Sequence, residues 1–503
     1  MLRTHRQNAR SLARTRPTAP LRRPGAVGVG RAAEPRAAAG LHPLTRGDEN
    51  ARLFAYEQRV KSSFDAIVPV LKQVSAMQHE PDFEQRAQAM VRDKLGFEVL
   101  DEILADAWVD QLDMRRLFAW CVFKTYRHYC DDFFTADPLG SADEESFQTF
   151  LQDCGFHTLD LSPCADGRLA HVIRYVLRLP YRAVRRKSYA GALFDIEDSL
   201  AKWTETELMR FREGRPNTAD APTRYLKAVV YHYSSVDPAH EGCAAHGSDA
   251  GRAAQAGLDR LLGFQRAVQN SFCCGASIDL LLIGLDTDTD STRVHVPDGN
   301  GVIDLDRYVD ALPLHAQTRH MTPTQAQDHF ASAIRGVAMD VTDGMARFIA
   351  RLLENNLSQI DYVRSFHGEH YSDIGHAERF IGAGIGFEEV QLRNLTYFAY
   401  MNTVEEAAPD LDVGVKIFTG LNVSHGLPIP IVVRYDYHGE VPGARDRAIA
   451  HCHRVDGALR ARYPDLEKRG LLHRLLVVRD CDAGAPIEVL GCSVKSQVPK
   501  GAH

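Results

Sequence analysis

Five residues whose side chains can bind a metal or move a proton stand at a spacing that could support catalysis. Cys164, Asp166 and Arg168 occupy alternate positions of one short segment. His232 and Cys243 follow, with ten residues between them. Two thiols and an imidazole are ligands that zinc favours, and three protein ligands leave a fourth position open, as in catalytic zinc sites. The sequence therefore predicts a catalytic metal site on Cys164, His232 and Cys243.

The other two residues supply a charged pair beside this site. We expect Asp166 to stay ionised, because a neighbouring Arg168 guanidinium favours the charged carboxylate. Zinc lowers the pKa of a bound water to near neutrality. An ionised Asp166 can accept a hydrogen bond from the resulting hydroxide and so aim its lone pair. The pair therefore predicts attack by zinc-bound hydroxide on an electrophile.

The pattern Cys-x-Asp-x-Arg followed by His and Cys resembles the β-type carbonic anhydrases. The usual spacing in that family is His-x-x-Cys, whereas ten residues intervene here. This longer spacing, with the segments Tyr231–Tyr233 and Cys243–Arg252, resembles the carboxysomal branch once called epsilon. The segment Ser162–His171 is the most specific part of a resemblance that extends from about residue 42 to the C-terminus.

The resemblance implies roles for the five residues and a reaction. In that family the two cysteines and the histidine bind one zinc ion per chain, and the Asp–Arg dyad orients the bound water. The implied enzyme is a zinc-dependent carbonic anhydrase, a lyase that interconverts CO2 and bicarbonate in the carboxysome of the bacterial cytoplasm. Its relatives are packaged with Rubisco inside a protein shell, so the implied direction is dehydration, which supplies CO2 to Rubisco for carbon dioxide fixation. A homo-oligomer built from homodimers is also implied.

Length and composition place this reaction in a multidomain protein. A chain of 503 residues predicts two to four domains. No apolar run approaches the roughly 20 residues that span a bilayer, so we expect no membrane partner. Ten cysteines in this length, two of them adjacent at Cys273 and Cys274, do not indicate a disulfide framework. No apolar segment follows the first basic residues, as a secretory signal would require.

The first 46 residues form a separate class of segment. They hold ten arginines, no lysine and one acid, Glu34. With few large apolar residues such a segment cannot offset its ordering entropy, so we expect disorder over residues 1–46. The family context favours a tether to Rubisco, to the shell or to both. The alternatives are a solvated tail, a targeting peptide or a nucleic-acid tail, and we expect no nucleic-acid partner.

The elements that position the site follow from apolar periodicity. Residues 47–138 read as a helical domain, with Trp108 expected in its core, and 139–393 as a catalytic α/β domain. In that domain strands are expected at Phe156–Leu161, Leu226–His232 and 278–285, with helices at 168–179, 251–272 and 323–357. Cys164 and His232 then lie at or just past the C-terminal ends of strands, where sites of open α/β sheets form.

The C-terminal region, 394–503, contains a faint repeat of the catalytic domain. We expect strands at Val413–Val423, Ile429–Tyr437 and Leu471–Arg479, and a helix over 444–462. The segment Val433–Tyr437 parallels Val229–Tyr233, which puts Asp436 in the place of His232 and Ser424 in the place of Cys164. The fold class is therefore α+β or α/β: a helical domain, a catalytic domain with a central sheet, and a degenerate, metal-free copy.

Other readings stay open at this stage. One is another zinc lyase or hydrolase, which would need a roomy cleft. Another is a zinc-stabilised shell or scaffold protein without turnover, which would need a fourth protein ligand such as His240, His246 or Asp166. His171, His240 and His246 are all possible proton carriers.

Three further clusters are expected to hold no metal. The first is His367–His370 with Asp373 and His376, which lacks the spacing that puts two histidines on one helix face. The second is His451–His453, in which neighbouring side chains point apart. The third, Asp286–Asp290, lacks the glycine and distal glutamate of a calcium loop and reads as a solvated acidic turn.

Overall fold

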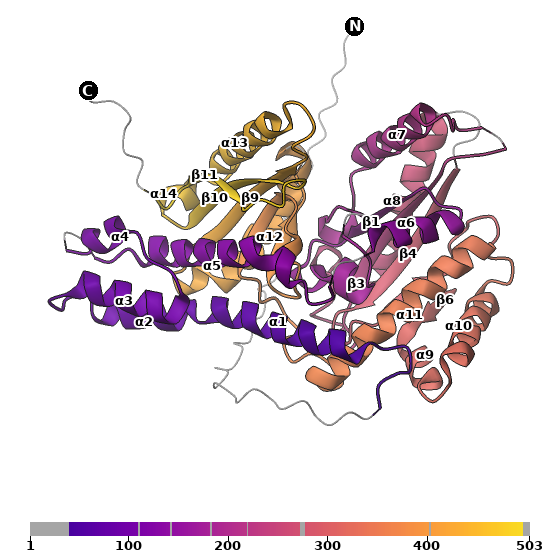
Figure 1. Ribbon diagram of the computed structural model, residues 1–503, viewed down its shortest axis with the longest axis horizontal. Helices are drawn as coiled ribbons and strands as arrows, with labels where there is room; N and C mark the ends of the chain where they lie inside the picture. Colours follow the sequence, from indigo (N-terminus) through magenta and orange to yellow (C-terminus); the bar gives the residue numbers. More distant parts are fainter. Residues whose placement is uncertain are drawn as a thin grey trace, which may run out of the picture. The chain divides into compact units, whose positions relative to one another are not determined.

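Two sheets and an N-terminal set of helices make up the described part of the protein (Figure 1). The computed structural model describes residues 40–108, 111–140, 143–181, 184–218, 220–271, 277–401 and 404–495. The predicted disorder of residues 1–46 therefore falls, up to residue 39, outside the described residues. Within them, no helix is both long and apolar enough to cross a membrane.

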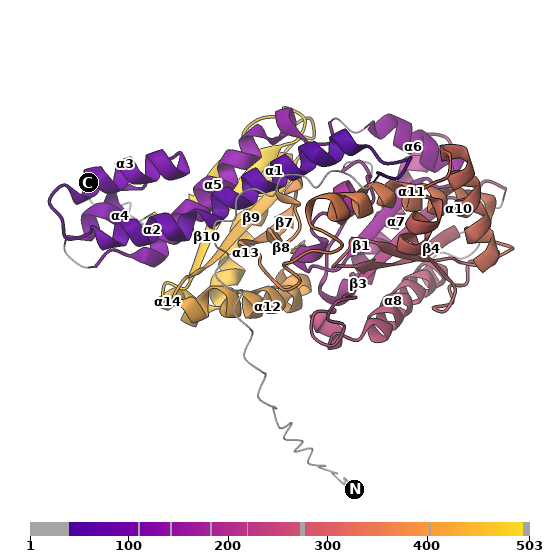
Figure 2. The same cartoon turned by 90° about the horizontal axis from the view of Figure 1, so that it is seen from below.

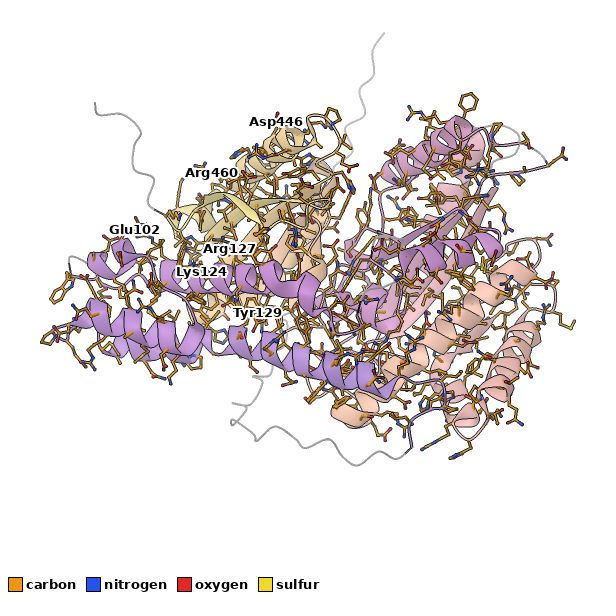
Figure 3. The ribbon with its side chains drawn as sticks, in the orientation of Figure 1. Glu102, Lys124, Arg127, Tyr129, Asp446 and Arg460 are labelled. Atoms are coloured by element: carbon orange, nitrogen blue, oxygen red, sulfur yellow. The ribbon has the colours of Figure 1, made fainter. Side chains whose placement is uncertain are left out.

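The N-terminal helices form because apolar residues recur every three or four positions. They are α1 (Gly47–Asp65), α2 (Ile67–Ala76), α3 (Phe83–Leu95), α4 (Asp101–Asp106) and α5 (Met114–Ala136). Figure 3 shows Tyr129 on α5, and its hydroxyl lies 2.6 Å from Ser63 Oγ of α1. The expectation that Trp108 is a core residue is wrong. Its side chain is 62% exposed, and the indole nitrogen donates to Glu84.

Residues 40–46, which the sequence analysis grouped with the disordered segment, pack against the catalytic domain. His42 is buried, and its backbone nitrogen donates to Asp361 Oδ2 at 2.7 Å. The Thr45 hydroxyl donates to the same oxygen at 2.6 Å. A buried carboxylate that accepts these bonds holds this stretch in place.

The first sheet has the strand order β2-β1-β3-β4-β5-β6. Its strands are β1 (Thr158–Pro163), β2 (Arg185–Arg186), β3 (Arg224–Tyr233), β4 (Ser277–Asp286), β5 (Thr292–His295) and β6 (Tyr308–Asp310). The strands β2, β1, β3 and β4 run parallel, and β5 and β6 are antiparallel. The three predicted strands are therefore confirmed, with shifts of one or two residues at their ends.

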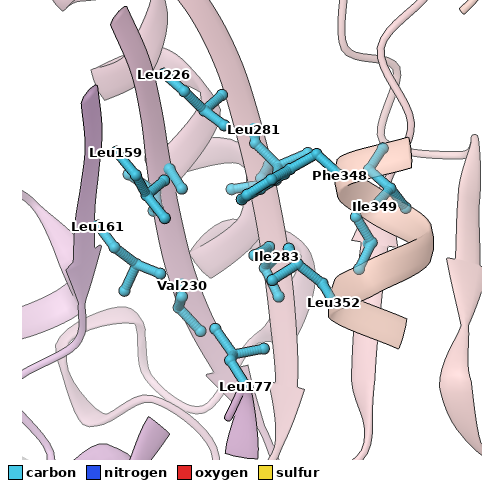
Figure 4. Close-up of a cluster of buried hydrophobic side chains, with 14 of the residues drawn as sticks. Leu159, Leu161, Leu177, Leu226, Val230, Leu281, Ile283, Phe348, Ile349 and Leu352 are labelled. Carbon is cyan, nitrogen blue, oxygen red and sulfur yellow. The ribbon is translucent and has the colours of Figure 1, made fainter. Parts of the chain in front are cut away.

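Helices cover both faces of this sheet. They are α6 (Glu144–Asp153), α7 (Ile196–Arg212), α8 (Ala250–Ser271), α9 (Ala311–Thr318), α10 (Pro323–Val337) and α11 (Asp343–Phe366). Helix α8 packs closely on one face, because Gly257 lies against Val229 and Leu282. Figure 4 shows Phe348 and Leu352 of α11 in the cluster on the other face. Hydrophobic burial on both faces fits a parallel sheet and fixes the strand ends that carry the site.

The predicted helix over 168–179 is present only as two short turns. They are the 3-10 turn η1 (Gly167–Leu169) and the π-helical turn η2 (Val172–Val176). Asp166 caps η1, because its carboxylate accepts from the Arg168 backbone nitrogen at 2.9 Å. This cap brings the Asp166 and Arg168 side chains together within one short turn.

The second sheet has the order β11-β10-β9-β7-β8. Its strands are β7 (Phe380–Ile385), β8 (Thr396–Ala399), β9 (Ile429–Tyr437), β10 (Leu472–Asp480) and β11 (Glu488–Cys492), and its helices are α12 (Val404–Leu421), α13 (Ala444–Arg462) and α14 (Pro464–Lys468). The predictions of β9, β10 and α13 are confirmed. The sheet begins at β7, before residue 394, at which the sequence analysis divides the domains.

The predicted strand Val413–Val423 is wrong, because most of it belongs to helix α12. Its β-branched residues favoured a strand locally, but their burial against the sheet is satisfied by one helix face. Figure 2 shows α12 and α13 on one side of the second sheet and α5 on the other. Side chains that alternate along β9 face these two layers in turn, since Val433 packs with α13 and Val432 packs with α5.

The two sheets share one topology. The order β2-β1-β3-β4-β5 corresponds to β8-β7-β9-β10-β11, and in each the first four strands are parallel and the last antiparallel. Ser162 pairs with Val229 and Ala383 pairs with Val433, so the register also corresponds.

In this register Ile385 is the counterpart of Cys164. The expectation that Ser424 takes the place of Cys164 is therefore wrong. Ser424 lies in a 3-10 turn before β9 (Val423–His425), not after the strand that pairs with β9. The adjacent Gly386 would bring a Cβ against the Asp436 carboxylate. In the second copy the chain just after β7 therefore lies against Asp436, the counterpart of His232.

Candidate active site

The three predicted metal ligands come together in the fold. Cys164 follows β1, His232 is the penultimate residue of β3, and Cys243 precedes a 3-10 turn, η4 (Ala244–His246). One ligand atom from each lies within 4.8 Å of the other two. Parallel pairing of β1 with β3 brings two of them to one sheet edge, and the loop after β3 returns the third.

The donor set fits a zinc ion. All three side chains are buried, and Nδ1 of His232 has no hydrogen-bond partner among the described residues. A hydrogen bond from Cys164, helped by the backbone amides of Ala245 and His246, lowers the pKa of the Cys243 thiol. Two buried thiols beside an imidazole would be poorly satisfied without a cation, and they match the ligand types of zinc.

The dyad is formed as predicted. Arg168 Nε donates to Asp166 Oδ1 at 3.0 Å and Nη2 donates to Oδ2 at 2.7 Å, a two-bond fork between buried groups. Burial opposes the charge of Asp166, but Arg168, with His376 and His232, holds the pKa of Asp166 well below its usual range. Asp166 Oδ2 also lies 3.3 Å from His232 Nε2, so the carboxylate reaches the metal-ligand set.

The far side of Arg168 fastens two loops. Nη1 donates to the backbone oxygen of Glu241 at 2.6 Å and to that of Ile374 at 3.0 Å. The first loop carries Cys243, and the second carries His376. One guanidinium therefore links the Asp166 carboxylate, the loop that carries Cys243 and the loop that carries His376.

His376 and Glu378 complete the site, and the sequence analysis did not place them there. His376 Nε2 lies 3.9 Å from Asp166 Oδ2, and its Nδ1 lies 3.0 Å from Glu378 Oε1. Glu378 Oε1 also accepts from the Gly167 nitrogen at 3.1 Å, and a Cβ at Gly167 would collide with this carboxylate. Burial opposes the charge, but Glu378 and Asp166 raise the pKa of His376 to about 9.

The pocket at these residues is small and mostly apolar. It offers about 20 Å³ for water-sized molecules, and one water needs roughly 10–15 Å³ by this measure. The C-terminal region supplies part of its wall through Tyr397, Val413 and Ile417. A pocket of this size suits a substrate such as CO2 and does not provide the roomy cleft that a larger substrate would need.

The possible fourth ligands do not join the set. His240 has a 78% exposed side chain and bonds to Asp237, while His246 Nε2 lies 3.1 Å from the Gly191 backbone oxygen. Asp166 is engaged by Arg168. Among the described residues, the candidate group therefore consists of Cys164, His232 and Cys243 alone.

The other histidines proposed as proton carriers or rival ligands lie elsewhere. His171 is buried against Asp290 at 2.7 Å. Neither the cluster from His367 to His376 nor His451–His453 forms a group of close donor atoms within the described ranges. The only other such group is Asp166, His376 and Glu378, which the hydrogen bonds above account for.

The acidic turn Asp286–Asp290 is not solvated as expected. Its three carboxylates are buried and accept bonds from neighbouring loops. Asp288 Oδ2 accepts from the Ser234 hydroxyl at 2.6 Å and from the Val236 nitrogen at 2.8 Å. These carboxylates brace the loop between β3 and Cys243, so the turn supports the site from behind.

Comparison with known proteins agrees with this geometry. Three family models match the chain: the N-terminal, catalytic and C-terminal domains of carboxysome shell carbonic anhydrase, over residues 42–134, 146–376 and 377–494. Proteins named carboxysome shell carbonic anhydrase are similar over most of their length. The one from Prochlorococcus marinus strain MIT 9313 is 57% identical over 467 residues, which is 92% of this chain and 91% of that protein. The one from Parasynechococcus marenigrum strain WH8102 is 59% identical over 90% of this chain and 79% of that protein. The one from Halothiobacillus neapolitanus is 47% identical over 89% of both chains. The chain therefore belongs to the carboxysome shell carbonic anhydrase family.

Proposed function

We propose that this chain is a zinc-dependent carbonic anhydrase that interconverts CO2 and bicarbonate. The observation that carries the proposal is the buried Cys164–His232–Cys243 set beside the Asp166–Arg168 fork, in a pocket of about 20 Å³. We assign metal binding to the first three residues and orientation of water to the pair. A zinc ion bound there would supply a nucleophile at neutral pH by lowering the pKa of a water molecule.

The chain's own side chains then account for the remaining requirements of the reaction. Asp166, fixed as a carboxylate, can accept a hydrogen bond from water in the pocket and set its orientation. Val413 and Ile417 offer CO2 an apolar surface and exclude further water. His376 lines the pocket, is oriented by Glu378 and has a side chain 22% exposed, so it can carry a proton from water in the pocket to solvent.

The location of the protein indicates which direction of the reaction is useful to the cell. Family membership puts the protein in the carboxysome, and dehydration of bicarbonate there would supply CO2 to Rubisco. We further propose assembly as a homo-oligomer built from dimers. We also propose a helical domain, a catalytic domain and a metal-free last domain, with the last boundary moved from residue 394 to before β7, because β7 belongs to the second sheet. The direct test is a stopped-flow assay of CO2 hydration on the full chain, with metal analysis before and after chelation. Activity that survives complete metal removal would contradict the proposal.

Replacing His376 with alanine is expected to lower kcat by about 100-fold, within the range of a lost acid–base group. The loss in kcat/KM should be smaller, because the side chain does not bind CO2. Added imidazole buffer should restore part of the rate, which a merely structural role would not allow. The Glu378→Gln variant keeps the His376 imidazole, so its kcat should fall less than that of His376→Ala. No rescue by imidazole, together with an unchanged kcat, would exclude His376 from proton transfer.

Removing residues 1–39 is expected to spare hydration activity in solution and to abolish packaging into carboxysomes. The cut keeps the His42–Asp361 anchor and every site residue. Arginine pairs well with carboxylates, so the removed segment should bind an acidic surface. The proposed partner is Rubisco, which the full chain should retain in a pull-down with affinity that falls as salt rises. Equal Rubisco binding and equal packaging of the full and shortened chains would rule the tether out.

A further inference from the structure

A second and larger pocket lies between the catalytic and C-terminal regions. It offers about 150 Å³ for water-sized molecules, against about 20 Å³ at the active site. Its polar lining includes Arg186 and Ser188 from the catalytic domain and Glu388 and Gln391 from the C-terminal one. Aromatic and aliphatic side chains make up much of the rest.

The place of this pocket mirrors that of the active site. The active pocket lies beyond the end of β1 and receives Tyr397 from β8. The second lies beyond the end of β7, the counterpart of β1, and receives Arg186 from β2, the counterpart of β8. The duplicated fold has therefore kept a pocket in the copy that lost the metal ligands.

Arg186 brings to this pocket a cation that has no direct carboxylate partner among the described residues, although its guanidinium lies 5.0 Å from the centroid of the Phe398 ring. Its Nε donates to Ser188 Oγ at 3.1 Å, and Nη1 donates to Gln391 Oε1 at 2.8 Å and to the Ala170 oxygen at 2.5 Å. Nη2 makes only a 3.4 Å contact with the Leu169 oxygen. All four acceptors are neutral, and no carboxylate of the described residues forms an ion pair with this guanidinium. A half-buried cation without a counter-ion favours an anionic ligand.

Glu388 places a second polar group in the pocket, which a ligand must also match. Its carboxyl group lies 3.9 Å from Arg434, which is itself paired with Asp436 and Glu389. Burial, with Asp436 and Glu389, raises the pKa of Glu388 to about 7. Because Arg186 and Glu388 both line the pocket, an anion that also carries a hydroxyl group can use both, with the hydroxyl donating to the Glu388 carboxylate.

We propose that this pocket binds a small hydroxycarboxylate, with its carboxylate on Arg186 and the Gln391 amide and its hydroxyl on Glu388. Because Gln391 Oε1 accepts from Arg186, the Gln391 amide nitrogen stays available to donate to a ligand. A space of about 150 Å³ accommodates several heavy atoms, more than CO2 or bicarbonate needs. The site is independent of the proposed catalytic function.

The test is ligand-observed NMR or calorimetry on the full chain with glycolate, acetate and inorganic phosphate. Glycolate should bind, acetate should bind at least about tenfold more weakly, and Arg186→Met should weaken glycolate at least tenfold, as expected for a lost bond to a charged group. Glu388→Gln should narrow the difference between glycolate and acetate. Arg335→Met, at an exposed arginine paired with Asp343, is the matched control.

Thermal melts separate lost binding from lost folding. If Arg186→Met does not fold, Gln391→Leu tests the same carboxylate contact and leaves the two backbone acceptors of Arg186 in place. No glycolate binding by the unaltered chain, equal binding by a folded Arg186→Met or Gln391→Leu variant, or tighter binding of phosphate than of glycolate would each overturn the proposal.

Discussion

Asp166→Asn is expected to lower CO2 hydration by at least about 100-fold while zinc content stays near that of the unaltered chain. The amide keeps the size of the carboxylate but loses its charge and presents a donor where water must donate. Arg168 then keeps its bonds to the Glu241 and Ile374 oxygens, so both loops remain fastened. The measurement is stopped-flow hydration together with metal analysis on the same sample.

Two control variants separate chemistry from stability. Asp412→Asn removes an exposed pair with Arg462 and should change neither stability nor rate. Glu389→Gln breaks a buried pair with Arg434 and should cost about 3–5 kcal/mol of stability, while the folded fraction keeps its rate. Full activity of Asp166→Asn at neutral pH would show that the dyad does not orient water.

Cys243→Ala is expected to reduce zinc from one ion per chain to near zero and to abolish hydration. Loss of an outer hydrogen-bond partner costs 10–100-fold in metal affinity, and loss of a direct ligand should cost more than about 100-fold. Cys452→Ala is the matched control, because Cys452 is equally buried in α13 but belongs to no group of three close ligand atoms among the described residues. That variant should keep its zinc and its rate.

Metal stoichiometry tests the degenerate copy in the same experiment. Unaltered protein should contain one zinc per chain, because the described part of the second copy holds no group of close donor atoms. Retention of zinc by Cys243→Ala would contradict the ligand set. A second zinc in the unaltered chain would contradict the metal-free assignment of the C-terminal region.

The sequence was sufficient for the elements that are continuous along the chain. Apolar runs indicated β3 and β4, and the position of His232 near the end of β3 followed from them. The pair Asp166 and Arg168 could also be predicted, since side chains two residues apart in a capped turn meet without help from distant parts. Local propensity failed at Val413–Val423, where packing against the second sheet selected a helix.

By itself, then, the sequence was enough to predict the candidate ligands, the Asp166–Arg168 pair and the strand ends that carry them, because spacing and periodicity are local properties of the chain. Only the tertiary structure brought His376 and Glu378 to Asp166, gave the pocket its wall from Val413 and Ile417, and revealed that Asp286–Asp290 is buried. Those contacts join segments far apart in sequence, and no local pattern encodes them. They form because the two copies of the sheet pack together and Arg168 fastens the loops between them.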